Sequence, residues 1–303
     1  MSEPIEILAA FDPAPERPPE AASGRYVLLD VFTEHPLEGN QLAVFTDARG
    51  MSTERMQSLA RELKLSESVF LLPGSEDGDV AVRIFTPSAE LPFAGHPVLG
   101  AAVLVGSALE LEEVTLETGA GPVAVRLRRE EGVVVSGWMS QPVPTWGPYE
   151  LELQLLAAVG VKTGSGLPVE VYDNGPRHLY VELDSEQAVA SLRPDLAALG
   201  ELGELTVSCF AGAGKHWKTR MFAPGLGVAE DPATGSAAGP LAVHLARHGR
   251  IDFGEEIEIR QGAEIARPSW LYAFTEGSPE KIEGVHVGGS AVMVGRGELL
   301  LGG

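Results

Sequence analysis

The sequence predicts an α+β fold in which two similar β-barrel units each surround one buried helix. Short β-branched and apolar segments outnumber helical ones, and most links between them are too short for the crossover of a parallel sheet. A stretch of the first half recurs in the second half, and both copies lead into a helix with little polar surface. We therefore expect mixed or antiparallel sheets curled around a core helix in each half, the two halves being related by pseudo-symmetry.

The first half begins with strands and one amphipathic helix. Residues 25–32, RYVLLDVF, and the segment GNQLAVF from Gly39 are rich in apolar residues, which is typical of strands. Ser52 is a good N-cap and Glu54 follows in the first turn, so STERMQSLARELK predicts a capped amphipathic helix. Further short strands are expected in SVFLL, VAVRIF, VTLET, PVAVRL and VVVSGWM.

The second half repeats this style, with helices expected in ELELQLLAAVG and PDLAALGEL. Strands are expected in HLYVELD, LTVSCF, KTRMF, EEIEIRQG, SWLYAF and GSAVMVGRGELLL. The proline cluster QPVPTWGP indicates a domain boundary. We expect an N-terminal barrel domain of residues 25–143 plus 286–303 and a C-terminal barrel domain of residues 144–285. Residues 1–24 combine prolines with acids and lack a signal-peptide pattern, which predicts a disordered leader.

The internal repeat consists of two blocks that align in the same order. RIFTP at 83–87 matches RMFAP at 220–224, and AELPFAGH at 89–96 matches AEDPATGS at 229–236. Chance similarity is the alternative in a chain with 36 glycines, but the shared order of the blocks favours duplication.

Each copy of the repeat ends at the start of an apolar helix, expected over residues 97–105 and 237–248. A helix that is hydrophobic on all sides is buried. The first amides of a helix have no helical partner and lie at the positive end of its dipole, so they bind anions. Two such helix starts that face one cleft would bind a carboxylate without lysine or arginine, although capping of two core helices explains the same pattern.

Four residues mark these helix starts, and three of them, Gly95, Gly235 and Ser236, are candidates for binding a ligand. Pro97 is expected at a first helical position, where its missing N–H costs nothing, and Ser236 is expected as an N-cap. Gly95 and Gly235 would let a ligand approach the backbone closely.

Composition limits the partners of the chain. The net charge is -21, from 43 acidic residues against 22 lysines and arginines. Such a surface repels nucleic acid and anionic membranes, whereas a small anion can still bind where local dipoles outweigh distant charges. No segment has the length of apolar sequence that a membrane span needs. Cys209 is the one cysteine, so no disulfide can form within the chain, which suits a reducing cytoplasm.

Glu67 is the candidate base. It lies between two serines in LKLSESVFLL, where a helix gives way to an apolar strand. A solvated loop carboxylate is the common case, and a base in an apolar cleft is the alternative, because burial raises the pKa of a carboxyl toward the range useful for proton transfer. The second half has no Ser-Glu-Ser counterpart, so one base would work with different groups, His96 and Asp231, on one small polar substrate.

Other motifs predict structure rather than chemistry. AGAGKHW resembles a phosphate-binding loop, but His216 stands where Ser or Thr should be, so a turn is expected. His244 and His248 are four residues apart but no acidic or cysteine ligand pattern accompanies them, and no metal site is expected. Cys209 lies in the middle of a strand and is expected in the core.

Several motifs together resemble the PhzF family of phenazine-biosynthesis proteins. They are PLEGNQLAVF, LSESVFLL, RIFTPSAELPFAGHPVLG, NGPRHLYV, CFAGAGKHWKTRMFAPGLGVAEDPATGSAAGPLAVHLARHG and EIEIRQGAEIARPS, and the resemblance runs from about Arg25 to the C-terminus. One departure is Gln41, where relatives usually carry proline, and it puts only a turn in doubt. The leader before Arg25 is a further departure and is expected to be dispensable.

The resemblance implies a diaminopimelate-epimerase-like fold in a homodimer and a cofactor-free isomerase of trans-2,3-dihydro-3-hydroxyanthranilate that yields an amino-ketone. By the same resemblance Glu67 moves the proton, while His96 and Asp231 hold the hydroxyl and amino groups of the substrate. The helix starts, with Gly95, Gly235 and Ser236, would hold the substrate carboxylate.

Three alternatives stay open at this stage. An amino-acid racemase on the same fold would use two cysteines as base and acid, and this chain has only Cys209. A PhzF-like isomerase or epimerase of another small amino acid is the second alternative. A non-catalytic protein that captures a small carboxylate is the third.

Overall fold

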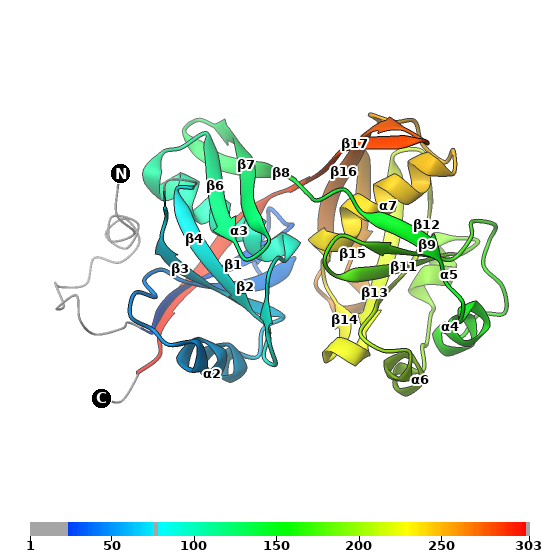
Figure 1. The fold of residues 1–303 in the computed structure, drawn as a ribbon, viewed down its shortest axis with the longest axis horizontal. Coiled ribbons are helices and arrows are strands. Elements are labelled where there is room, and N and C mark those ends of the chain that lie inside the picture. Colours follow the sequence, from blue (N-terminus) through cyan, green and yellow to red (C-terminus); the bar gives the residue numbers. More distant parts are fainter. Residues whose placement is uncertain (1–23, 76–77, 301–303) are drawn as a thin grey trace. The chain divides into compact units, whose positions relative to one another are not determined.

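The computed structural model describes residues 24–75 and 78–300, and the chain forms two compact units. Unit 1 comprises Met1–Met139 and Gly288–Gly303, and unit 2 comprises Ser140–Val287 (Figure 1). The structure therefore divides the chain a few residues away from the boundaries expected at 143/144 and 285/286. The expected leader lies outside the described residues except for Gly24. Within the described part of the chain, no helix is long and apolar enough to cross a membrane.

Unit 1 is a curled sheet around helix α3. Its elements are β1 (Arg25–Val31), β2 (Asn40–Phe45), α2 (Thr53–Leu63), β3 (Glu67–Pro73), β4 (Val80–Phe85), β5 (Glu90–Leu91), α3 (Gly95–Leu109), β6 (Glu113–Thr118), β7 (Gly121–Glu130), β8 (Val133–Ser140) and β18 (Ala291–Glu298). The sheet is mixed, because β2 and β4 each have one parallel neighbour, β3 and β6 respectively, while the other pairings of this unit are antiparallel.

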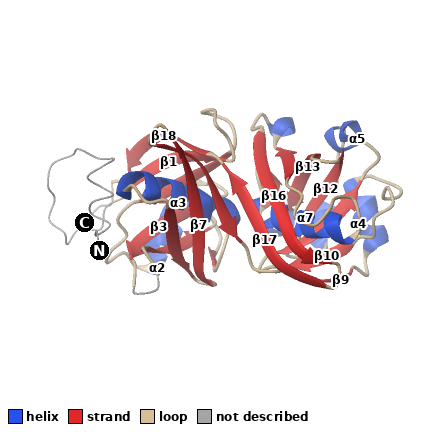
Figure 2. Cartoon of the chain, turned by 90° about the horizontal axis from the view of Figure 1, so that it is seen from above, coloured by secondary structure: helices blue, strands red, loops and turns tan. Residues whose placement is uncertain are grey.

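Helix α3 is the core of unit 1. Its residues from Gly95 to Gly106 are all buried, and it packs against strands that include β1, β2, β6 and β7. Figure 2 shows α3 among the strands of its unit. Gly100 makes this packing close, because a Cβ there would lie 2.6 Å from a methyl of Leu42 and 2.8 Å from one of Val31. The absence of a polar face on α3 in the sequence thus matches its enclosure by the sheet.

Unit 2 surrounds helix α7 with a second mixed sheet. Its elements are β9 (Thr145–Pro148), α4 (Glu152–Val159), β10 (Glu170–Asp173), β11 (Arg177–Glu182), α5 (Glu186–Ala190), α6 (Leu196–Glu201), β12 (Thr206–Ala213), β13 (His216–Ala223), η1 (Pro224–Leu226), β14 (Val228–Asp231), α7 (Gly235–Arg247), β15 (Ile257–Gln261), η2 (Ala263–Ile265), β16 (Ser269–Ser278) and β17 (Lys281–Gly289). Residues Gly235 to Ala246 of α7 are all buried.

The two units share a topology, which confirms the internal repeat. The run β2–β3–β4–β5–α3–β6–β7 has the same pairings as the run β11–β12–β13–β14–α7–β15–β16. In both runs the first pair and the pair that spans the central helix are parallel, and the other pairs are antiparallel. The fold is therefore the α+β arrangement of two similar barrels that the sequence predicts.

An arginine–glutamate pair occupies the same place in both copies of the repeat. Arg83 donates to Glu90 at 2.7 and 2.6 Å, and Arg220 donates to Glu230 at 2.8 and 2.7 Å. Each pair ties the long strand before the repeat loop, β4 or β13, to the short strand β5 or β14 that leads to the central helix. The pair thereby fixes the path of the chain into each helix start.

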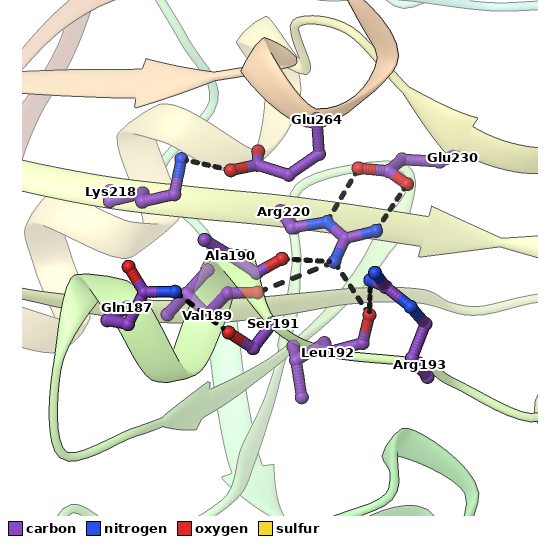
Figure 3. A network of polar contacts seen from close by, with 10 residues as sticks. All are labelled: Gln187, Val189, Ala190, Ser191, Leu192, Arg193, Lys218, Arg220, Glu230 and Glu264. Atoms are coloured by element: carbon purple, nitrogen blue, oxygen red, sulfur yellow. Dashed lines mark hydrogen bonds and ion pairs between the residues drawn. The ribbon is translucent and has the colours of Figure 1, made fainter.

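The copy in unit 2 is the buried one. The Arg220 and Glu230 side chains are 7% and 12% exposed, against 28% and 39% for Arg83 and Glu90. Figure 3 shows why, since the Arg220 guanidinium also donates to the Leu192 carbonyl at 3.0 Å and to carbonyls at the end of α5. Lys218 on the same strand pairs with Glu264 at 2.7 Å.

Both central helices begin earlier than expected, and two local predictions are wrong. Pro97 is the third residue of α3 rather than the first. It is tolerated there because the carbonyl four residues back belongs to Phe93, before the N-cap Ala94. Ser236 is the second residue of α7 and not its N-cap. The N-cap is Thr234, whose carbonyl already accepts from the amides of residues 237 and 238.

Candidate active site

Glu67 is the first residue of β3, at the junction that the sequence indicates. Helix α2 ends at Leu63, and Lys64 turns the chain in the left-handed conformation with φ 55°. Glu67 then pairs with Leu42 of β2 in parallel register. Its side chain is 18% exposed, and the next residue, Ser68, is fully buried. The carboxylate is therefore largely shielded from solvent at the edge of an apolar core.

His96 lies beside Glu67. The two side chains approach to 3.4 Å between His96 Nδ1 and Glu67 Oε2, and the Asn40 amide nitrogen is also 3.4 Å from Nδ1. Burial lowers the pKa of His96 to about 3, although a hydrogen bond with the Gln41 backbone opposes this effect. The imidazole is thus neutral at pH 7 and can both donate and accept a hydrogen bond. Within the described residues its Nε2 is buried without a partner.

The two helix starts offer equivalent amides. In α3 the first helical bond runs from Val98 N–H to the Ala94 carbonyl at 3.2 Å, so the amides of Gly95 and His96 precede it. In α7 the amides of Gly235 and Ser236 likewise precede the bond from residue 237 to residue 234 at 3.0 Å. Such amides at the positive end of a buried helix suit a carboxylate.

Asp231 is held by a directional chain of buried side chains. Thr234 donates its hydroxyl to Asp231 Oδ2 at 2.6 Å. Gln261 Nε2 donates to Thr234 Oγ1 at 3.0 Å and to the Asp231 carbonyl at 2.8 Å. Thr219 in turn donates to Gln261 Oε1 at 3.1 Å. Since Gln261 uses both amide hydrogens, the Thr234 proton is committed to the carboxylate, and Asp231 acts as an acceptor on that oxygen.

The structure brings the expected residues together in two groups. Glu67, His96 and Gly95 lie together in unit 1. Asp231 lies in unit 2, where Gly235 and Ser236 begin the helix that its partner Thr234 caps. That both groups serve one cleft stays a prediction.

Three polar residues of these groups were not singled out by sequence reasoning. They are Asn40, Thr234 and Gln261. Asn40 and Gln261 lie within motifs that carry the family resemblance, which was the available signal. Their roles depend on contacts across 56 and 30 residues of chain, and no local pattern encodes such contacts.

The remaining predictions divide into one confirmed turn, one confirmed core residue and one missed cluster. AGAGKHW forms the hairpin turn between β12 and β13, with Ala213 opposite His216. Cys209 is fully buried, and burial raises the pKa of its thiol to about 12, so it is not a nucleophile. The cluster pairs His244 and His248 with Glu170, an acidic partner that the sequence analysis did not find.

The Glu170 cluster fits an ion pair better than a metal site. Arg247 Nη1 donates to Glu170 Oε2 at 2.8 Å, and His248 Nε2 and the Tyr172 hydroxyl approach the same oxygen at 3.0 and 2.9 Å. A guanidinium on the only carboxylate of the group repels a cation. The cluster instead fastens the C-terminal end of α7 to β10.

Comparison with known proteins identifies the family of this chain. The family model described as "Phenazine biosynthesis-like protein" matches residues 29–297. The chain belongs to this PhzC–PhzF family. Among its curated relatives, the trans-2,3-dihydro-3-hydroxyanthranilate isomerase of Pseudomonas aeruginosa is 52% identical over 277 residues, which cover 91% of this chain and 99% of that protein. The isomerase of the same name from Pseudomonas chlororaphis is 49% identical over 91% of this chain and 99% of its own length.

Solved structures with a similar fold include both members of this family and more distant proteins. A PhzF-family phenazine biosynthesis protein from Bacillus anthracis superposes with a TM-score of 0.80 at 25% identity, covering 93% of this chain and all of that one. A probable proline racemase from Agrobacterium radiobacter superposes with a TM-score of 0.62 at 14% identity, covering 92% and 93%. The second likeness concerns the fold alone and confirms the epimerase-like architecture.

Proposed function

We propose that this chain is a trans-2,3-dihydro-3-hydroxyanthranilate isomerase that works by proton transfer through Glu67. The observation that carries the proposal is the approach of Glu67 Oε2 to the neutral His96 imidazole at the start of a buried helix. The identity of 52% with a relative of that name supports the substrate.

Glu67 is the proposed base. It removes the proton from the substrate carbon that bears the hydroxyl, and the double bonds of the ring shift so that a proton returns at another ring carbon. No atoms are gained or lost, and the resulting enol becomes the amino-ketone. A carboxylate that is 18% exposed at the edge of an apolar core suits this role, because a bound substrate can bring its C–H within reach of the oxygen.

His96 and Asp231 are the proposed binding groups for the hydroxyl and amino substituents. A neutral imidazole can accept from or donate to a hydroxyl, and a carboxylate that is itself held by Thr234 accepts from an amino group. The amides of Gly95 and His96 and those of Gly235 and Ser236 would bind the substrate carboxylate. We propose that both groups bind one substrate molecule.

The partners and location proposed for the enzyme follow the family. We propose a homodimer in the cytoplasm, which light scattering in solution would test by a mass twice that of one chain. The racemase alternative lacks its chemistry, since Cys209 is buried with a raised thiol pKa.

The decisive experiment replaces Glu67 with its isostere. Incubation with trans-2,3-dihydro-3-hydroxyanthranilate is followed by ultraviolet absorbance. We expect E67Q to lose about 10³-fold in turnover while binding of 3-hydroxyanthranilate, the aromatic counterpart of the substrate, survives. E62Q on the exposed face of α2 is the matched control. Unchanged turnover in E67Q would eliminate Glu67 as the base, and a wild-type chain without turnover would reject the proposed substrate.

A further inference from the structure

Helix α7 carries a proline in a place where it removes a helical hydrogen bond. Pro240 lies inside α7, and a proline has no N–H to offer the carbonyl four residues back, which belongs to Ser236. The proline of α3 causes no such loss, because Pro97 lies in the first turn. The start of α7 therefore has a buried carbonyl that its own helix cannot satisfy.

Asn174 supplies the missing donor. Its Nδ2 donates to the Ser236 carbonyl at 3.0 Å, across 62 residues of chain. Asn174 is 7% exposed and lies in the turn between β10 and β11. Gly175, with φ +120°, donates its amide to Asp173 Oδ1 at 3.0 Å, which fixes that turn. The side-chain amide of Asn174 is thus positioned by a hydrogen-bonded turn.

Two more side chains hold the neighbouring carbonyls. Gln141 Nε2 donates to the Gly235 carbonyl at 2.9 Å, and the Tyr180 hydroxyl donates to the Ala237 carbonyl at 2.6 Å. Gln141 can lie flat on the helix because residue 239 is glycine, where a Cβ would meet Gln141 Oε1 at 2.5 Å. Three successive carbonyls of the first turn therefore receive side-chain donors from outside the helix.

Two of these donors act on the first two peptide units of α7. Gln141 acts on the unit that joins the Gly235 carbonyl to the Ser236 N–H, which is one of the amides available to a ligand. Asn174 acts on the next unit, which joins the Ser236 carbonyl to the Ala237 N–H, and that N–H already donates to the Thr234 carbonyl at 3.0 Å. A donor on a carbonyl fixes the plane of its peptide and polarises it, which strengthens the N–H on the other side as a donor. The first turn of α7 is thereby oriented before any ligand arrives.

We propose that Asn174, together with Gln141, is a positioning residue that fixes the first turn of α7 for binding the substrate carboxylate. The inference rests on the proposed function for the identity of the substrate. Asn174 replaces the donor that Pro240 removes and acts through the helix. The competing role is direct contact with substrate through Asn174 Oδ1, which has no hydrogen-bond partner within the described residues.

A compensating pair of substitutions separates the two roles. N174A leaves the Ser236 carbonyl unsatisfied, and we expect KM for the dihydro-hydroxyanthranilate to rise about tenfold with kcat within about twofold, the pattern of lost ground-state binding. In N174A/P240A the backbone N–H of residue 240 can bond that carbonyl again, so KM should return to within about threefold of wild type. P240A alone should bind substrate like wild type.

An independent readout does not need turnover. The amide resonance of Ser236 in a ¹H–¹⁵N spectrum of the ligand-free chain should move in N174A and return in N174A/P240A. If the wild-type chain does not turn over the substrate while this resonance is restored, the proposed function fails and the positioning of the helix start stands.

Y180F removes a donor from the Ala237 carbonyl, which keeps its helical partner at Leu241, so its KM should change less than that of N174A. A double variant as impaired as N174A, with the Ser236 resonance restored, would overturn the proposal in favour of direct contact. An unmoved Ser236 resonance in N174A would overturn it as well.

Discussion

His96 Nδ1 lies 3.4 Å from Glu67 Oε2, although the two residues come from different elements and are separated by a hairpin and a loop. Residue 67 opens β3 and residue 96 is the second residue of α3. At this contact a partly buried carboxylate and a neutral imidazole lie beside the amides of a helix start. Acid–base chemistry on a small carboxylate needs these three features within reach of one another.

Replacement of His96 tests its contribution to turnover. We expect H96N to reduce kcat about 10²-fold, because the asparagine cannot reproduce the reach and proton exchange of the imidazole. Initial rates followed by absorbance give the measurement. H35N on the exposed loop after β1 is the control and should turn over like wild type. Equal rates for H96N and wild type would remove His96 from the machinery.

The buried histidines predict how stability depends on pH. Burial lowers the pKa of both His96 and His178 from 6.5 to about 3. Between these values the unfolded chain binds protons that the folded chain excludes, so the free energy of unfolding falls as pH drops from 6.5 toward 3. Each histidine contributes a slope of about 1.4 kcal/mol per pH unit.

Chemical denaturation at several pH values measures this slope. His178 is fully buried beside Thr206 and belongs to no proposed binding group, so H178N isolates one contribution. Between about pH 4 and 6 its slope should be lower than that of wild type by about 1.4 kcal/mol per pH unit, and H35N should keep the wild-type slope. An H178N slope equal to that of wild type would show that His178 is not neutral in the fold.

Much of the fold follows from local pattern. The capped helix α2 after Ser52, the apolar helices and the repeated Arg-x-Phe strands all have signatures within a few residues. Glu67 could also be identified as a candidate from the sequence, since the change from helix to strand around it is visible there. The repeat supplied the topology, because two copies of one block predict two copies of one unit.

The missed features depend on contacts that sequence spacing does not reveal. Gln261 is the last residue of β15, and it contacts Thr234 because β15 pairs in parallel with β13. These two strands are separated in the sequence by the whole of α7. Glu170 meets His248 across 78 residues. The helix starts were placed two residues late because glycine and proline weaken the propensity for helix there, whereas burial and the carbonyls of Ala94 and Thr234 decide the boundary.

Thr234 offers a test of the hydrogen-bond chain on Asp231. T234V keeps the shape of the side chain but removes the donor to Asp231 and the acceptor for Gln261. We expect kcat/KM to fall at least about tenfold, because the carboxylate loses its fixed orientation and a buried amide loses its partner. T234S retains the hydroxyl and should stay within about threefold of wild type. If T234V and T234S behaved alike, the hydroxyl would have no part in holding Asp231.

The repeated arginine–glutamate pair gives a matched comparison of buried and exposed ion pairs. E230Q leaves Arg220 with an uncompensated charge in a site where its side chain is 7% exposed, and we expect a loss of about 3 kcal/mol in the free energy of unfolding. E90Q removes the equivalent partner of Arg83, whose pair is open to water and screened, so its loss should be about 0–1 kcal/mol. Equilibrium urea denaturation of both variants measures the difference. Similar losses for the two variants would mean that the carbonyls around Arg220 hold its charge without Glu230, since they are the partners that Arg83 lacks among its described contacts.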